Sequence, residues 1–228
     1  MKMQLVFATG NQDKVREIRE ILNDPELAVF SMREVGISSD PEENGTTFEE
    51  NALIKARAAA RLLFAAPLAA PLDPKVPTFV LSDDSGLVVD ALDGAPGILS
   101  ARYLGRDTSY PEKMGAILHK LEGLSGPERS ARFVCACAAV YPTRTLPAGA
   151  AGTDDAKELK ECVVTAAMEG EIADSIRGQH GFGYDPFFYL PELGKTSAEL
   201  TDDEKNAISH RGKALRSMMD VLRKVSVS

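Results

Sequence analysis

Four stretches of the chain repeat apolar residues at intervals of three and four positions, which is the spacing of one face of a helix. Three of them begin at Asn, Asp or Thr, residue types that cap helix beginnings. The predicted helices follow a cap at Asn11 or Asp13, run from Phe48 to about residue 65, cover residues 111–122, and occupy the segment 201–222.

Shorter runs rich in β-branched and apolar residues lie between these helices and are typical of strands. Residues 131–141 are almost continuously apolar, which favours a central strand. The run 79–92 is expected as two strands, because Ser85 and Gly86 are typical turn residues. The other predicted strands are residues 4–9, 27–30 and 161–168.

Three segments have the composition of surface loops. Residues 38–46 are polar, and residues 65–77 and 142–160 are rich in Ala, Pro and Gly. With 228 residues, the chain is long enough for one α/β domain of residues 1–228, or for two small lobes, with 65–77 and 142–160 as surface insertions.

The net charge and the cysteine content argue against several classes of protein. A formal net charge of −8 argues against a general affinity for nucleic acid or anionic membranes. Three cysteines, none at zinc-ligand spacing, indicate a reducing compartment without a disulfide framework. The apolar run near the N-terminus is too short for a signal peptide or a membrane span, so a cytoplasmic protein is expected.

The strongest candidate for chemistry is the pair Asp83 and Asp84, which directly follows an apolar run. A buried unpaired carboxylate is costly, so a functional role would require a partner charge. One interpretation is a solvated Asp-Asp-Ser-Gly turn. The alternative is a Mg²⁺ site in which one Asp holds metal or activates water.

Two helix beginnings offer further candidates. Thr9, Gly10, Asn11 and Lys14 lie at a strand-to-helix junction, where backbone N–H groups suit a phosphate, although Asn11 is equally placed to be a cap. Thr47 and Glu50 form a capping-box pattern.

Glu50 is therefore either a capping residue or a second metal carboxylate. Lys55 is among the basic residues nearest to it in the chain.

The last third of the chain carries candidates for binding a base. Gly-rich residues 178–186 include Phe182 and Tyr184, at a backbone that bends sharply. Lys205 and His210 would point about 140° apart on one straight helix. These side chains can face one ligand only if the helix is interrupted. We therefore expect a break near Ser209, which would cap a second helix and place His210 and Arg211 in its first turn.

Five segments together resemble the inosine/xanthosine-triphosphate pyrophosphatases, also called non-standard purine NTP pyrophosphatases. They follow one another in the family's order from the first strand to the last helix. They are ATGNQDK at 8–14, TFEENALIKA at 47–56, DDSGLVVDALDGAPGILSARY at 83–103, GFGYDPFF at 181–188 and SAELTDDEKNAISHRGKAL at 197–215.

The resemblance implies an elongated α/β fold with a central mixed sheet, flanking helices and two lobes around a deep nucleotide-binding cleft. It also implies a homodimer that needs Mg²⁺ and hydrolyses ITP, dITP and XTP to the monophosphate and pyrophosphate. No nucleic-acid or membrane partner is expected. Two alternatives remain. The chain could be a related enzyme that acts on modified pyrimidine nucleotides, or a nucleotide-binding protein that has lost catalysis.

The resemblance further implies the roles of individual residues. Asp84 acts as the base and holds Mg²⁺ together with Glu50, while Lys14, Lys55 and Lys205 neutralise the triphosphate. The remaining substrate-binding residues implied are Thr9, Gly10, Asn11, Ser85, Phe182, Gly183, Tyr184, Asp185, His210 and Arg211.

Overall fold

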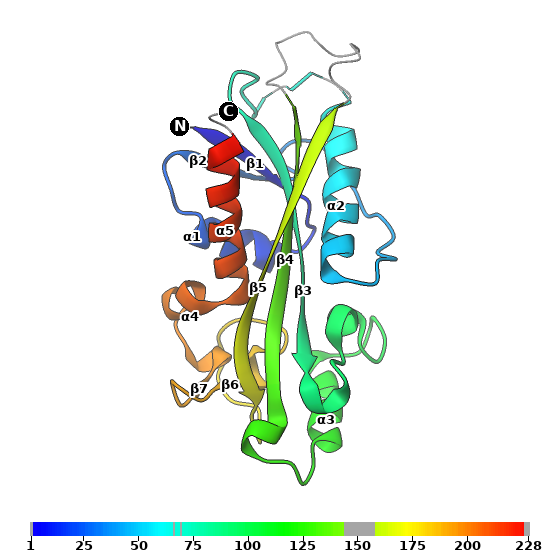
Figure 1. The fold of residues 1–228 in the computed structure, drawn as a ribbon, viewed down its shortest axis with the longest axis vertical. Helices are drawn as coiled ribbons and strands as arrows, with labels where there is room; N and C mark the ends of the chain where they lie inside the picture. The colour runs from blue at the N-terminus through cyan, green and yellow to red at the C-terminus, as the bar shows by residue number, and fades with distance from the viewer. Residues whose placement is uncertain (1, 66, 69, 144–157, 226–228) are drawn as a thin grey trace. The chain divides into compact units, whose positions relative to one another are not determined.

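The structure, a computed structural model, describes residues 2–65, 67–68, 70–143 and 158–225. It contains a seven-stranded mixed sheet flanked by helices, in the strand order β2-β1-β3-β4-β5-β6-β7 (Figure 1). Strand β1 pairs in parallel with β2 and β3, whereas β6 pairs antiparallel with β5 and β7. The α/β class and the mixed sheet expected from the sequence are confirmed.

The helices and the strands β1 to β5 lie close to the predicted ranges, whereas β6 and β7 were not predicted. The strands are β1 (Met3–Phe7), β2 (Leu27–Ser31), β3 (Thr78–Val89), β4 (Ser130–Pro142), β5 (Leu159–Ile172), β6 (Phe188–Leu190) and β7 (Lys195–Thr196). The α-helices are α1 (Gln12–Ile21), α2 (Phe48–Leu63), α3 (Tyr110–Lys120), α4 (Asp202–Ile208) and α5 (His210–Val225).

The chain separates into two compact units. The first comprises Met1–Asp84, Ala136–Thr165 and Ala214–Ser228, and the second comprises Ser85–Cys135 and Ala166–Lys213. The predicted insertion at 142–160 lies mostly outside the described residues, since 144–157 are not described. In the part of the chain that is described, no helix is both long and apolar enough to cross a membrane.

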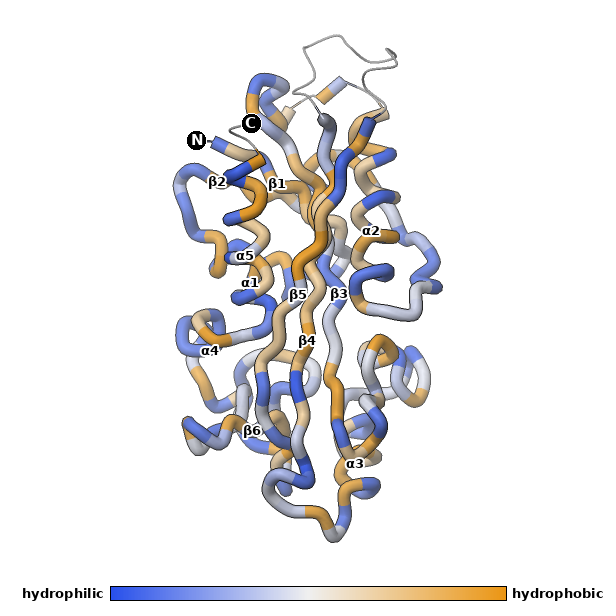
Figure 2. The backbone as a smooth tube through the Cα atoms, in the orientation of Figure 1, coloured by the Kyte–Doolittle hydropathy of each residue, from blue (hydrophilic) through white to orange (hydrophobic). Residues whose placement is uncertain are grey.

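Small side chains let α2 pack closely on the sheet of the first unit. Its buried face carries Ala52, Ala56, Ala59 and Ala60, and these residues join one hydrophobic cluster with Val6, Val80, Ala136 and Ala138. Figure 2 shows the corresponding alternation of apolar and polar positions along α2. The close approach also lets the Ser82 hydroxyl donate a hydrogen bond to the Ala52 carbonyl.

The second unit has its own core. Leu87 and Val89 of β3 pack with Met114 and Ile117 of α3 and with aromatic residues from the turn before β6. Arg129, although buried, donates to the Ile172 and Ala173 carbonyls and so ties the beginning of β4 to the end of β5.

The expected turn at Ser85 and Gly86 is wrong. Strand β3 runs without interruption from Thr78 to Val89, and Gly86 is not among the glycines with positive φ. Asp83 and Asp84 therefore lie in the middle of a strand rather than at its end. Ser and Gly are common in turns but do not require one. Pairing with the neighbouring strands keeps Ser85 and Gly86 extended in β3.

Candidate active site

Asp83 and Asp84 are both buried, with 2% and 8% of their surface exposed. Each forms an ion pair with a different lysine of the first unit. The Nζ atom of Lys14, on α1, lies 3.0 Å from Oδ2 of Asp83. The Nζ atom of Lys55, on α2, lies 2.8 Å from Oδ1 of Asp84.

The position of these acids in a strand explains the two separate partners. Successive side chains of a strand point to opposite faces of the sheet. Two adjacent acids are therefore served by different helices, and each buried charge has an opposite charge close by. The solvated-turn interpretation of this motif is excluded by the burial of both carboxylates.

Glu43 is a site residue that the sequence did not reveal. Its Oε1 atom lies 3.4 Å from Nζ of Lys55, so one ammonium joins Glu43 of the 38–46 loop to Asp84 of β3. The sequence indicated only that this loop is polar. No local pattern shows that the loop folds back onto α2, because the contact joins a loop residue to the second turn of the helix that follows it.

Burial is the main influence on the charge of Asp84. It raises the pKa of Asp84 above its usual range, and the Lys55 charge offsets this only in part. For Lys55, burial lowers the pKa, but Asp84 and Asp83 more than compensate, so the net pKa is raised. Asp84 thus becomes protonated at a higher pH than an ordinary aspartate, whereas Lys55 keeps its charge.

The donor set at Asp84 fits a hard divalent cation. The second carboxylate oxygen of Asp84, Oδ2, is buried and has no hydrogen-bond partner among the described residues. Carboxylate oxygens are the ligands that Mg²⁺ prefers, and Mg²⁺ keeps several waters and needs few protein ligands. Within the described residues, no group of three or more His, Cys, Asp or Glu side chains could hold a metal ion.

Glu50 is exposed and is bound to its neighbouring loop. Its Oε2 atom accepts hydrogen bonds from the Thr46 backbone N–H at 2.6 Å and from the Thr46 hydroxyl at 2.9 Å. These bonds lower the pKa of Glu50, the backbone N–H having the larger effect. Thr47 caps α2 by accepting from the Glu50 N–H, but the reciprocal bond of a capping box goes to Thr46 instead.

The residues before α1 form a capped helix beginning. Asn11 Oδ1 accepts from the backbone N–H groups of Asp13 and Lys14, at 2.9 Å and 3.2 Å. The Thr9 hydroxyl oxygen accepts from the Asn11 N–H. Two of the backbone N–H groups that were expected to bind a phosphate therefore already donate to the Asn11 side chain. The Lys14 side chain still supplies a positive charge at this position.

In the second unit, the Gly-rich turn is built around a buried ion pair. Lys205 Nζ lies 2.7 Å from Oδ2 of Asp185, and the same oxygen accepts from the Phe182 backbone N–H at 2.8 Å. A Cβ on Gly181 would lie 2.3 Å from Asp185 Oδ2. Only glycine fits at residue 181, which also has a positive φ of +75°.

Two cations face the Phe182 ring. Lys205 Nζ lies 5.1 Å from the ring centroid, and the Arg211 guanidinium carbon lies 5.5 Å from it. Arg211 and His210 are buried, and the His210 ring stacks on Phe133 at 4.9 Å. His210 and Arg211 therefore do not lie on a solvated helix face.

The break near Ser209 is confirmed. Helix α4 ends at Ile208, Ser209 has an extended backbone, and α5 begins at His210. The Ser209 hydroxyl oxygen accepts from the Gly212 backbone N–H at 3.0 Å, which caps α5.

Tyr184 does not offer the aromatic face that the sequence suggested. It is 3% exposed, its ring stacks on Phe187 at 5.7 Å, and its hydroxyl donates to the Ser100 carbonyl. Burial raises the pKa of Tyr184. Phe182, which is only half-buried, is the aromatic residue of this turn that remains accessible.

The candidate residues thus form two groups that the structure describes separately. The acid–lysine group belongs to the first unit and contains Lys14, Glu43, Lys55, Asp83 and Asp84. The aromatic–basic group belongs to the second unit and contains Phe182, Asp185, Lys205, His210 and Arg211. Ser85, half-buried in β3, is the first residue of the second unit.

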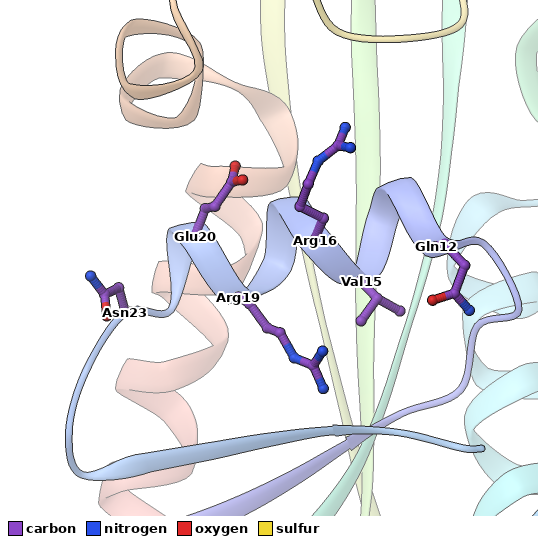
Figure 3. Close-up of a pocket in the computed structure, with 6 residues that line it drawn as sticks. All are labelled: Gln12, Val15, Arg16, Arg19, Glu20 and Asn23. Carbon is purple, nitrogen blue, oxygen red and sulfur yellow. The ribbon is translucent and has the colours of Figure 1, made fainter. Parts of the chain in front are cut away.

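A separate hollow of about 440 Å³ lies along α1 (Figure 3). It is wide open and carries side chains of both charges, and no member of the two groups lines it. Its lining residues are Gln12, Val15, Arg16, Arg19, Glu20 and Asn23.

The fold and the site define an α/β protein in which a mixed sheet carries a buried acid pair neutralised by lysines. Comparison with known proteins then gives the family. Residues 5–221 match the model of the Ham1 family, and this chain belongs to that family. The resemblance found in the five sequence motifs is confirmed.

Similar proteins cover nearly the whole chain. The chain is 43% identical to a dITP/XTP pyrophosphatase of Geobacillus kaustophilus, a match covering 94% of this chain and 92% of the relative. It is 44% identical to a dITP/XTP pyrophosphatase of Yersinia pseudotuberculosis, covering 96% and 98%. A Ham1 protein structure from Coxiella burnetii has a TM-score of 0.74 and 38% identity, covering 97% of this chain and 99% of that one.

Proposed function

We propose that this chain hydrolyses non-standard purine nucleoside triphosphates, namely ITP, dITP and XTP, to the monophosphate and pyrophosphate. The observation that carries the proposal is the buried Asp84, held 2.8 Å from Lys55 in the middle of β3. The names of relatives that match over more than nine-tenths of this chain support it. The cellular role that follows is removal of deaminated purines from the nucleotide pool of the cytoplasm.

Asp84 is the group that we assign to activate water. A general base must be ionised yet basic enough to take a proton, and burial moves the pKa of Asp84 in the required direction. Lys14 and Lys55 supply positive charge for the triphosphate and for the diphosphate that leaves. Displacement of Lys14 or Lys55 from its acid by the incoming anion would free a carboxylate for metal or water.

Mg²⁺ is the cofactor that the donor set suggests, and Asp84 Oδ2 is the oxygen available to it. When bound, the cation neutralises phosphate oxygens and polarises the phosphorus that water attacks. Glu50 was the second ligand expected from the motif. The geometry favours Glu43 instead, because Lys55 joins Glu43 to Asp84 whereas the Glu50 carboxylate is bound to Thr46.

The aromatic–basic group is assigned to the purine. Phe182 provides an accessible ring, and the beginning of α5 provides backbone N–H groups together with His210 and Arg211. A donor directed at the C6 carbonyl of inosine or xanthosine would meet a donor, the C6 amine, in adenosine. Lys205 is included in this group because it forms an ion pair with Asp185. We therefore do not assign it to the phosphates alone.

We further propose that the protein acts as a homodimer with no nucleic-acid or membrane partner. Sedimentation equilibrium of the purified chain tests the oligomeric state. A mass near twice 24.5 kDa is expected, and a mass near 24.5 kDa would contradict it.

Product analysis tests the proposed reaction. With ITP and Mg²⁺, phosphorus NMR should show inosine monophosphate and pyrophosphate, and chelation with EDTA should stop the reaction. Release of orthophosphate with inosine diphosphate would indicate a different bond cleavage. Nucleotide binding without turnover would identify a binding protein and overturn the proposal.

A further inference from the structure

The backbone turn that carries Phe182 is also contacted by Tyr110, the first residue of α3. The Tyr110 ring meets the Tyr184 ring edge-on, with centroids 5.1 Å apart and an interplanar angle of 89°. A Cβ on Gly183 would lie 3.5 Å from the Tyr110 ring and 3.8 Å from its hydroxyl oxygen. Tyr110 therefore packs directly on the backbone that follows Phe182.

Two features hold the Tyr110 ring in this position. The capping box of Ser109 and Glu112 fixes the beginning of α3 at Tyr110. One turn later, Lys113 Nζ lies 4.9 Å from the Tyr110 ring centroid and donates to the Ala101 carbonyl at 2.7 Å. Because Lys113 is 2% exposed, its attraction to the ring is little screened by water.

The Tyr110 hydroxyl is available to a ligand. It forms no hydrogen bond to any residue that the structure describes, whereas the Tyr184 hydroxyl donates to Ser100. Tyr110 is 36% exposed, although its neighbours Tyr184 and Lys113 are buried. Burial, and after it the charge of the nearby Asp185, raise the pKa of Tyr110, so its hydroxyl keeps its proton at neutral pH.

We propose that Tyr110 is a specificity-determining residue whose hydroxyl meets the C2 edge of the purine. This rests on the assignment of the Phe182 turn to the base. The C6 edge of the purine is assigned to the beginning of α5. Tyr110 belongs to a different element, α3, and packs on Gly183, so we assign it to another edge of the same base. ITP, XTP and GTP share the C6 carbonyl and differ at C2, which carries hydrogen, a carbonyl or an amine.

A tyrosine hydroxyl can donate to the xanthine carbonyl or accept from the guanine amine, but it gains nothing from the C–H of hypoxanthine. The substitution Tyr110→Phe removes this one bond and leaves the ring against Gly183. We expect kcat/KM for XTP or GTP to fall about two- to tenfold relative to that for ITP, the range of one net hydrogen bond. Affinities for XMP, GMP and IMP, measured by calorimetry, should shift by the same ratios.

Tyr103→Phe is a matched control, because Tyr103 also lies under a lysine. Lys120 Nζ lies 5.5 Å from its ring centroid and donates to its hydroxyl at 2.9 Å. This variant should leave all base ratios unchanged. Unchanged XTP/ITP and GTP/ITP ratios in Tyr110→Phe, or the same shift in Tyr103→Phe, would overturn the proposal.

Failure of the proposed reaction would show separately. If the parent binds purine monophosphates but hydrolyses no triphosphate, the calorimetric ratios still decide the role of Tyr110. If it neither binds nor hydrolyses them, both proposals are wrong.

Discussion

At the scale of single residues, the proposed hydrolysis depends on two buried acids and on the lysines that neutralise them. An unpaired carboxylate with 2% or 8% exposure would be strongly unfavourable. Lys14 and Lys55 make these positions tolerable in the ligand-free protein and are also suited to a triphosphate. Under the proposed function, the same charges would stabilise the fold before substrate binds and neutralise the triphosphate afterwards.

Replacing Asp84 by Asn should abolish most of the activity while keeping the fold. The substitution keeps the shape but removes the base, which is typically worth about 10²–10⁴-fold in kcat. Steady-state kinetics with ITP, alongside circular dichroism, measures both effects. Turnover within threefold of the parent would remove Asp84 from the mechanism.

Glu43 and Glu50 can be separated by their magnesium requirement. If Glu43 accompanies Asp84, Glu43→Gln should raise the Mg²⁺ concentration needed for half-maximal activity, and Glu50→Gln should leave it nearly unchanged. Calorimetric titration of Mg²⁺ provides a readout without turnover. The reverse result would return the ligand role to Glu50.

The bonds from Thr46 to Glu50 predict a pH dependence of stability. They lower the folded-state pKa of Glu50 below its ordinary value of 4.5. The stabilisation is therefore complete above the unfolded-state value and is lost as pH falls through the folded-state pKa. The difference in Tm between the parent and Glu50→Gln should shrink between pH 6 and pH 3, and a constant difference would contradict this origin.

At the scale of elements, the break between α4 and α5 is the clearest case of local sequence determining local structure. Thr201 with Glu204 forms a capping box for α4, and Ser209 caps α5. These signals lie within a few residues of one another, so they could be read from the sequence. The bounds of α2 followed equally from local periodicity, and those of β4 followed from a continuous apolar run.

What the sequence did not predict depends on contacts between distant segments. The continuity of β3 through Ser85 and Gly86 is set by strand pairing, and the approach of Glu43 to Lys55 is set by a loop that folds back. The roles of Lys205 and Tyr184 in the second unit likewise depend on partners at Asp185, Ser100 and Phe187. Residue types identified the candidates, but only the packing shows which of them are accessible.

The Lys205–Asp185 pair predicts a stability effect within the second unit. Lys205→Met leaves the Asp185 carboxylate, whose side chain is 4% exposed, without its ionic partner. Removing one member of a buried pair typically costs about 3–5 kcal/mol. Urea denaturation should show this loss in Lys205→Met and substantial recovery in the double variant with Asp185→Asn. Equal stability of parent and single variant would contradict a structural role for the pair.

At the scale of the whole molecule, the net charge of −8 does not exclude an anionic substrate, because each group of candidate residues contains basic side chains that a phosphate or a base could contact. Lys14 and Lys55 stand at the acid pair of the first unit, and Lys205 and Arg211 stand around Phe182 in the second. Strands β3, β4 and β5 each contribute residues to both units.

The central claim is tested most directly by kcat/KM measured with Mg²⁺ over a panel of triphosphates, with pyrophosphate as the detected product. ITP, dITP and XTP should be the best substrates, and ATP should be at least about 10²-fold poorer because a donor directed at C6 rejects the amine there. Pyrimidine triphosphates should also be poor substrates. Asp84→Asn should lower the values for all substrates together. Equal values for ITP and ATP, or a preference for pyrimidine triphosphates, would contradict the account.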